Sequence, residues 1–146
     1  MTANQDRSRV EIFRRRDVPT AGSGVIRIGD MVIADGSGNA TVATGTDDAV
    51  ADALLGVSLH AKPTGETPTI AVVADGVFEM DLASGLSVAL KVGDPVEFDD
   101  ANSNAQTVKS GSTNPIGKVY RACPVGAVTV MVHIIGRDVR IPVVAD

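Results

Sequence analysis

The feature that most constrains the fold of this chain is an internal repeat. Residues 26–35 and 90–99 both run from an aliphatic strand pattern through a Gly-Asp pair into a turn rich in Gly, Ser or Asn. Residues 55–65 and 116–126 form a second matched pair in the same order, with the same spacing between their glycines. Two copies of hairpin-rich sequence predict a duplicated β unit, because each half exposes an apolar face that the other half can cover.

Residues 25–146 are expected to form one all-β domain, a compact barrel or sandwich built from internal repeats over about 25–82 and 89–135. Only 3% of the residues are aromatic, so aliphatic side chains must fill the core, which suits a narrow barrel. Residues 47–54 alone are typical of a helical turn. The predicted strands are residues 25–34, 41–43, 54–61, 69–73, 76–82, 94–99, 107–108, 116–122, 127–135 and 139–144.

The repeated pairs Gly29–Asp30 and Gly93–Asp94 are predicted to be structural turns. Glycine permits a left-handed backbone, and the aspartate can accept hydrogen bonds from neighbouring amides. General acid–base chemistry would need the two carboxylates close together and desolvated, which aspartates in separate turns seldom are. Both pairs are therefore interpreted as tight turns that lead into strands.

The net charge of −5 is divided unevenly along the chain. Residues 1–24 hold five arginines against three acidic residues, a net of +2, which leaves −7 on the remainder. Residues 19–24 are rich in Gly, Ser and Pro and favour a flexible junction, so residues 1–24 are expected to be an extended basic arm, with a frayed terminus as the alternative. The predicted partner contacts on the arm are Val10, Ile12, Phe13, Arg14, Arg15 and Arg16.

Several kinds of chemistry are disfavoured by the pattern of residues. An acidic body argues against nucleic acid as a direct partner, because phosphate binding needs dense Lys and Arg along a face. No apolar run approaches the roughly 20 residues that span a membrane. The phosphate-loop-like stretch 111–119 has one residue too many between its glycines and continues as a strand, which argues against nucleotide hydrolysis.

No metal or other cofactor is expected, since His60, His133 and Cys123 are the only nitrogen and sulfur ligands and follow no zinc spacing. Cys123 with His133 is the one catalytic pair that can be proposed. A lone cysteine in an apolar strand is more often a buried small hydrophobe, so the chain is not expected to be an enzyme. A single cysteine also precludes an intramolecular disulfide and favours synthesis in a reducing cytoplasm.

Three stretches carry a resemblance to a known family: residues 74–80, residues 90–99 with their Asn-rich turn, and residues 116–132. They resemble the small capsid decoration, or cement, proteins of tailed phages, a family long treated as a domain of unknown function and often mislabelled as recombinase-like. The resemblance covers roughly residues 25–135. The recombinase label would require an ATP site, which the interrupted phosphate loop cannot supply.

The resemblance implies a non-enzymatic virion protein that trimerises on the capsid exterior, at threefold or quasi-threefold positions, and braces the major capsid protein. The expected partners are therefore the major capsid protein and further copies of this chain, without nucleic acid, membrane or cofactor. The basic head and a strand-like tail over 137–146 depart from the family pattern and leave open which end makes the main contact. The alternative is a β-barrel binding module of a cellular complex that recognises a peptide or carbohydrate.

Overall fold

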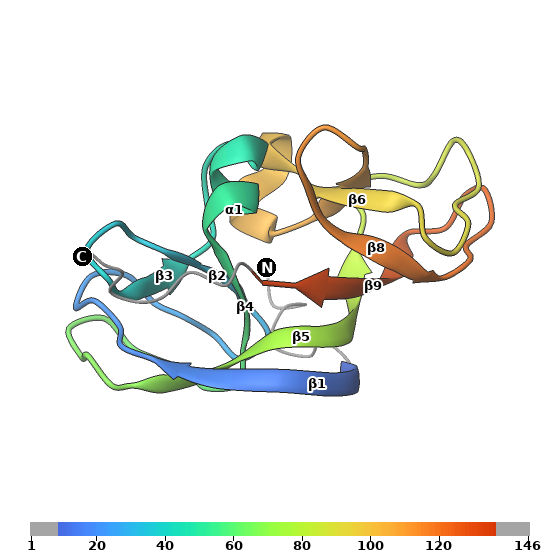
Figure 1. The fold of residues 1–146 in the computed structure, drawn as a ribbon. Coiled ribbons are helices and arrows are strands. Elements are labelled where there is room, and N and C mark those ends of the chain that lie inside the picture. The colour runs from blue at the N-terminus through green and yellow to red at the C-terminus, as the bar shows by residue number, and fades with distance from the viewer. Residues whose placement is uncertain (1–8, 137–146) are drawn as a thin grey trace.

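A computed structural model describes residues 9–136, which form one curled antiparallel sheet with a short helix (Figure 1). The strands are β1 (Arg9–Val18), β2 (Met31–Ala34), β3 (Ala40–Val42), β4 (Leu54–Ser58), β5 (Ile70–Asp81), β6 (Pro95–Phe98), β7 (Val108–Ser110), β8 (Pro115–Arg121) and β9 (Thr129–Ile135). Helix α1 spans Asp47–Ala53, and a 3-10 helix spans Asp100–Ala105. The sheet curls into a half-barrel, which confirms the all-β prediction.

The strand order of the sheet divides into two equivalent halves. It runs β3-β2-β4-β5-β9-β8-β6-β7, with β1 paired to the other edge of β5. We call β2 to β4 with the start of β5 the first half, and β6 to β9 the second half. Counted inward from the two outer edges of the sheet to the central strands β5 and β9, each strand of the first half has a counterpart at the same position in the second half. Because β5 and β9 are antiparallel, the loops of the two halves lie at opposite ends of the molecule (Figure 1).

The two Gly-Asp turns have the same hydrogen bonds. Gly29 and Gly93 both have φ of 93°, a left-handed value that favours glycine. In each turn the amide three residues before the aspartate donates to its carboxylate at 2.8 Å. In each, the glycine amide also donates at 2.9 Å to a backbone carbonyl, that of Ser58 in β4 or of Val119 in β8. The carboxylates of Asp30 and Asp94 thus fix the local backbone from which β2 and β6 begin.

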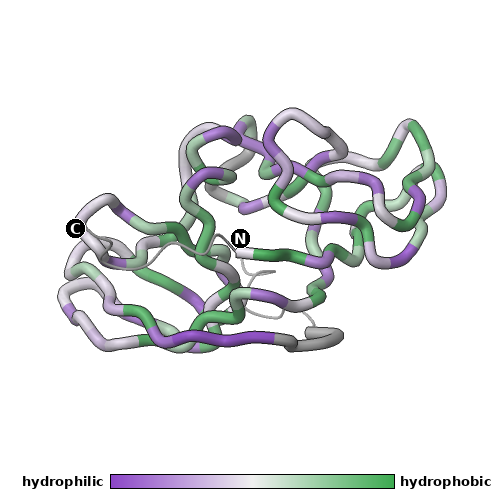
Figure 2. Tube along the Cα trace, viewed as in Figure 1, coloured by the Kyte–Doolittle hydropathy of each residue, from purple (hydrophilic) through white to green (hydrophobic). Residues whose placement is uncertain are grey.

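The hydrophobic core consists of two clusters whose members correspond by position. The smaller cluster contains Val18, Ile26, Val32, Ala40, Leu55, Ile70 and Val72. The residues with matching strand or bridge positions in the second half all belong to the larger cluster: Met80, Leu90, Val96, Val108, Ile116, Val130 and Val132. Figure 2 shows the hydrophobic positions following the strands of both halves. The matched contacts accord with two internal repeats, and their common origin stays a prediction.

Part of the predicted arm belongs to the sheet. Residues 1–8 lie outside the described residues, but Arg9–Val18 forms β1 and pairs along β5 from Ile70 to Phe78. Val18 is buried in the smaller core cluster. The run of charged residues in this strand lacks the alternation that marks a half-buried strand, which is why the sequence does not predict it.

Other element boundaries differ from those predicted. Residues 69–73 and 76–82 were expected to be two strands, but β5 continues through Asp75 and Gly76 because β1 and β9 pair with it there. Residues 25–30 form an isolated bridge and a turn, so the strand begins only at Met31. The helical turn predicted over 47–54 is confirmed as α1, and the predicted strand 139–144 lies outside the described residues.

Two matched glycines permit close approach between strands. A Cβ at Gly56 would run into the carbonyl oxygen of Val73, and a Cβ at Gly117 would run into that of His133. We expect Gly56→Ala and Gly117→Ala each to destabilise the fold by about 2–3 kcal/mol, because neighbouring backbone must move. Urea unfolding measures the effect. Gly22→Ala is the control, because a Cβ there would meet only a methyl group at 3.7 Å; equal losses in all three variants would contradict the prediction.

Candidate functional site

Strand β1 carries the basic residues that the sequence predicts as a partner contact. Arg14 and Arg15 are exposed, and Arg16 is half-buried. Val10, Ile12 and Phe13 belong to β1 by their backbone, and their side chains lie outside the described part of the chain. The structure therefore presents a strand with arginines at a sheet edge.

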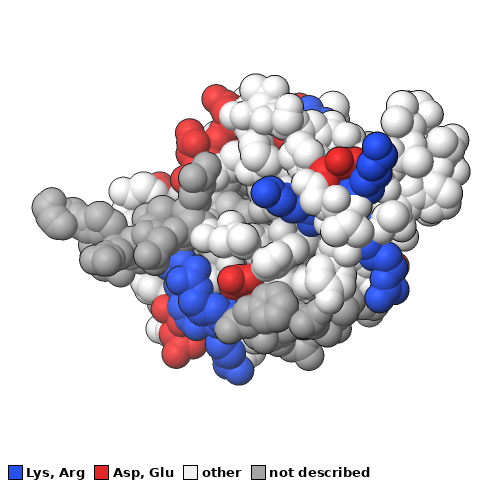
Figure 3. Space-filling view, turned by 45° about the vertical axis from the view of Figure 1, so that its right-hand side comes forward, with Lys and Arg blue, Asp and Glu red and all other residues white. Residues whose placement is uncertain are grey.

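Positive charge is not gathered into one stripe. Figure 3 shows the Lys and Arg side chains of the viewed face in separate groups, with acidic side chains near several of them. Lys109, for example, forms ion pairs with Asp47 at 3.4 Å and Asp100 at 4.0 Å. This face therefore lacks the continuous basic track that binding along a phosphate backbone uses.

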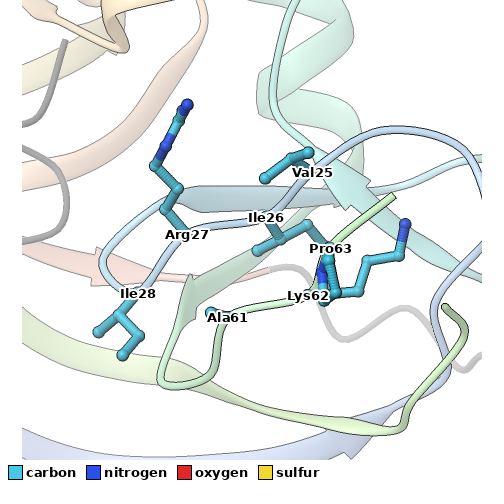
Figure 4. A pocket seen from close by; sticks show the side chains of 7 residues that line it. All are labelled: Val25, Ile26, Arg27, Ile28, Ala61, Lys62 and Pro63. Atoms are coloured by element: carbon cyan, nitrogen blue, oxygen red, sulfur yellow. The ribbon is translucent and has the colours of Figure 1, made fainter. Parts of the chain in front are cut away.

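A pocket of about 520 Å³ lies between the segments 25–28 and 61–63, in the first half (Figure 4). Its lining is mostly aliphatic, with Arg27 and Ile28 extending in opposite directions in Figure 4. Lys62 is 1% exposed, and its ammonium donates to the carbonyl oxygens of Ser23 at 3.1 Å and Gly24 at 2.7 Å. Lys62 thus fastens the neighbouring loop, and the lining offers an apolar surface without a nucleophile or a carboxylate.

A second pocket, of about 780 Å³, lies between the halves and is lined by residues of β1, α1, β4, β6, β8 and β9. On its wall, His133 Nε2 lies 2.6 Å from Asp75 Oδ1. The pair joins β9 to β5 across the sheet. An imidazole held by a carboxylate can serve as a base for a nucleophile, but the residues that line this pocket include no hydroxyl or thiol.

Cys123 and the two histidines lie in different settings. Cys123 is buried opposite Leu90 and borders a small pocket of the second half, whereas His133 borders the pocket between the halves. His60 Nδ1 accepts a hydrogen bond from the amide of Ala71 at 3.0 Å. The structure does not bring the proposed Cys123–His133 pair into one pocket.

The described residues contain neither a metal-binding cluster nor a membrane-spanning helix. Within residues 9–136 no group of three or more His, Cys, Asp or Glu side chains is placed to hold a metal ion. No helix in that part of the chain is long and apolar enough to cross a membrane.

Exposed aliphatic side chains are more numerous at one end of the molecule than at the other, where Val25 and Ile28 are exposed, a feature that the sequence analysis missed. We define the second end as the loops 83–93 and 122–128, and the first end as the loops 19–30 and 59–69. The large hydrophobic residues exposed at the second end are Val88, Val92, Val125 and Val128. Strand prediction assigns valines to a core, but the absence of charge from residues 82–90 and 122–128 is a signal that could have identified this surface.

The buried thiol of Cys123 gives a test of the catalytic alternative. Burial raises the pKa of Cys123, so less thiolate forms near pH 8 than at an exposed cysteine. We expect an aromatic disulfide reagent to modify the native protein at least roughly tenfold more slowly than the urea-unfolded protein. Ser84→Cys in a Cys123→Ala background places a thiol at an exposed position and should react fast. Rapid modification of native Cys123 at pH 7 would indicate an activated thiol.

Comparison with known proteins gives one family. The family model of phage cement proteins matches residues 47–134, which is more than half of the chain and runs from α1 into β9. No curated protein matches the chain. Strands β1, β2 and β3 precede the matched region.

Proposed function

The chain belongs to the phage cement protein family, and from this membership we propose that it binds the outer surface of an assembled phage capsid and stabilises the shell. The family is one of structural proteins that associate with the capsid of the virion, rather than of enzymes. The observation that carries the proposal is the match over residues 47–134, which includes β4, β5, β8 and all but the last residue of β9, the strands at the centre of the sheet.

Stabilisation follows from preferential binding. A protein that binds the assembled shell and not the separate subunits shifts the equilibrium toward the shell by mass action. The proposed partner is the major capsid protein. We further propose that three copies of this chain act together at threefold or quasi-threefold positions, because the first contact raises the effective concentration of the other two.

We place one contact with the major capsid protein on β1. This strand pairs with β5 along one edge, and no strand of the described chain pairs with its other edge. A partner strand can add to such an edge through main-chain hydrogen bonds. The exposed Arg14 and Arg15 would then pair with carboxylates on the partner. Val10, Ile12, Phe13 and Arg16 belong to the same proposed contact.

The proposal is tested by sedimentation with expanded empty shells. We expect the protein to pellet with the shells in a saturable manner and to raise the temperature at which the shells release a packaged dye. Lysozyme of similar mass serves as the control for trapping in the pellet. A module that recognises a carbohydrate would remain in the supernatant, and that result would contradict the capsid function.

Charge reversal on β1 gives a specific prediction. Arg14→Glu with Arg15→Glu should weaken shell binding by roughly tenfold at low salt and reduce its salt dependence, because exposed charges act mainly through screened attraction. Isothermal titration at several salt concentrations measures both quantities. Arg27→Glu, an exposed arginine of the first end, is the control. Deletion of residues 1–24 is unsuitable, since it would uncover β5 and remove Val18 from the core.

Equal losses from the β1 double variant and from Arg27→Glu would show a general effect of charge, without a contact at β1. Unchanged binding by the double variant would remove β1 from the mechanism. Circular dichroism and a thermal melt establish that each variant is folded before its binding is compared.

A further inference from the structure

The pocket of about 780 Å³ between the halves is bordered by a row of three side chains that crosses the sheet. Pro95 in β6 is paired with Lys118 in β8, and Lys118 is paired with His133 in β9. Residues paired in this way lie on the same face of a sheet. Helix α1 lies against β6 and β8 (Figure 1) and contributes Ala51 to the lining. The pocket therefore lies over one face of the second half, and its volume is within the range of ligand sites.

The first half contains the same row of paired residues, which are Met31, Val57 and Val73. All three are apolar and at most 1% exposed. They belong to the larger core cluster, together with many residues of the second half. The side chain of Gln106, which follows β6, accepts from the amide of Met31 at 2.8 Å and donates to its carbonyl oxygen at 3.0 Å. In the first half this face is therefore an internal interface that the second half covers.

The second half has basic side chains at two of the three positions. Counted from the matched glycines of β4 and β8, Lys118 occupies the position of Val57, and its partner His133 occupies that of Val73. The side chain of Lys118 is exposed, and that of His133 is half-buried. Burial of a charge against an apolar core without a partner is unfavourable. A second copy of this chain therefore cannot cover this face in the way that the second half covers the first.

The charged side chains that line the pocket are Arg14, Lys118 and His133, and none is acidic. Arg14 and Lys118 are exposed, and neither side chain has an ion pair or hydrogen bond with a described residue. Asp75 is within 2.6 Å of His133 Nε2. The other described acidic residues in the lining elements, or next to them, are outside the lining: Asp17, Asp47, Asp48, Asp52, Asp94 and Glu97.

Three of these acidic side chains already have partners elsewhere. Asp47 forms an ion pair with Lys109. The carboxylate of Asp94 accepts from the amide of Lys91 at 2.8 Å, and that of Glu97 accepts from the amide of Thr113 at 2.7 Å. The two basic side chains at the pocket are thus available to a carboxylate of a partner.

The pocket also offers an apolar contact beside its basic groups. Ile135 lines it and is 56% exposed, two residues after His133 and therefore on the same face of β9. Leu54 and Ile116 contribute further aliphatic lining. The complementary occupant is a peptide segment that carries a carboxylate next to an aliphatic side chain. Arg14 also belongs to the contact proposed at β1, so the pocket is continuous with that contact.

We propose that this pocket receives a segment of the major capsid protein, in which a carboxylate pairs with Lys118 and Arg14 and a neighbouring aliphatic side chain packs against Ile135. The inference rests on the proposed capsid function and specifies the chemistry of the capsid segment beside β1. Attraction between charges and burial of apolar surface then act at one place, which gives the contact specificity as well as affinity.

Two single variants test the two parts of the contact. Lys118→Glu should weaken binding to expanded shells by roughly tenfold and reduce its salt dependence, because it reverses the charge that faces the carboxylate. Ile135→Thr should weaken binding by roughly fivefold and leave the salt dependence unchanged, because it removes apolar contact alone. Both positions are exposed, so the thermal midpoints should stay within about 2 °C of the wild type.

The matched controls are Lys91→Glu and Val92→Thr, which make the same kinds of change at exposed positions outside the pocket. Both controls should bind shells as the wild type does. Losses in the controls equal to those in the pocket variants would overturn the inference.

Photocrosslinking identifies the occupant. Pro115→Cys in a Cys123→Ala background places a thiol at an exposed position in the pocket lining, where a benzophenone maleimide can be attached. After illumination on shells, mass spectrometry should find the label joined to a capsid peptide with an acidic residue beside an aliphatic one. The same label on Ser84→Cys, outside the pocket, should not mark that peptide. A label joined to a second copy of this chain, or to residues 137–146 of the same chain, would overturn the inference.

The binding results separate this inference from the proposed function. Wild-type protein that binds shells while Lys118→Glu and Ile135→Thr bind equally well would overturn the pocket contact and leave the capsid function standing. Wild-type protein that fails to bind shells overturns both. Arg14 is unchanged in these variants, so their result is independent of the charge reversal on β1.

Discussion

The pairing of strand β5 with three other strands is the interaction on which the rest of the structure depends. Its first residues pair with β4, its later residues pair with β9, and β1 runs along the opposite edge. Between Ile70 and Ala74 every residue of β5 is buried, so its backbone groups need partners within the sheet. Because one strand belongs to both halves, the two ends of the molecule cannot turn independently without breaking this pairing.

A common scaffold explains which residues match between the halves and which do not. The residues that match are those that turn the chain or fill the core, such as Gly29 with Gly93 and Ile26 with Leu90. Lys62 and Cys123 occupy corresponding bridge positions, yet one fastens a loop through its ammonium group and the other is a small buried thiol. The fold thus fixes the backbone at these positions and leaves the side chains free to differ, which is how two similar ends can acquire different surfaces.

Much of the sheet could be predicted from the sequence because its strands are short, aliphatic and separated by Gly, Pro or Asp. The positions of β2, β4, β6, β8 and β9 follow from that pattern, and α1 follows from the alternation of Asp47, Asp48 and Asp52 with Val50 and Ala51. The pairing of β1 could not be predicted, because the strand lies at a sheet edge where charged residues such as Arg14 and Arg15 stay exposed, and its sequence lacks hydrophobic alternation. The exposed valines could not be separated from core valines either, since hydrophobicity alone does not distinguish a buried strand from an apolar loop.

The arrangement also bears on why a shell would use such a protein. Copies of this chain that act together, as proposed, would cooperate, because the second contact forms at the effective concentration set by the first and a stiff connection loses little entropy on binding. A flexible arm would lose part of that gain through the ordering of its residues. In this chain the basic segment from Arg9 to Val18 is already ordered against β5. The cost of ordering it is therefore met during folding, so a partner bound at β1, as proposed, would not have to supply that cost.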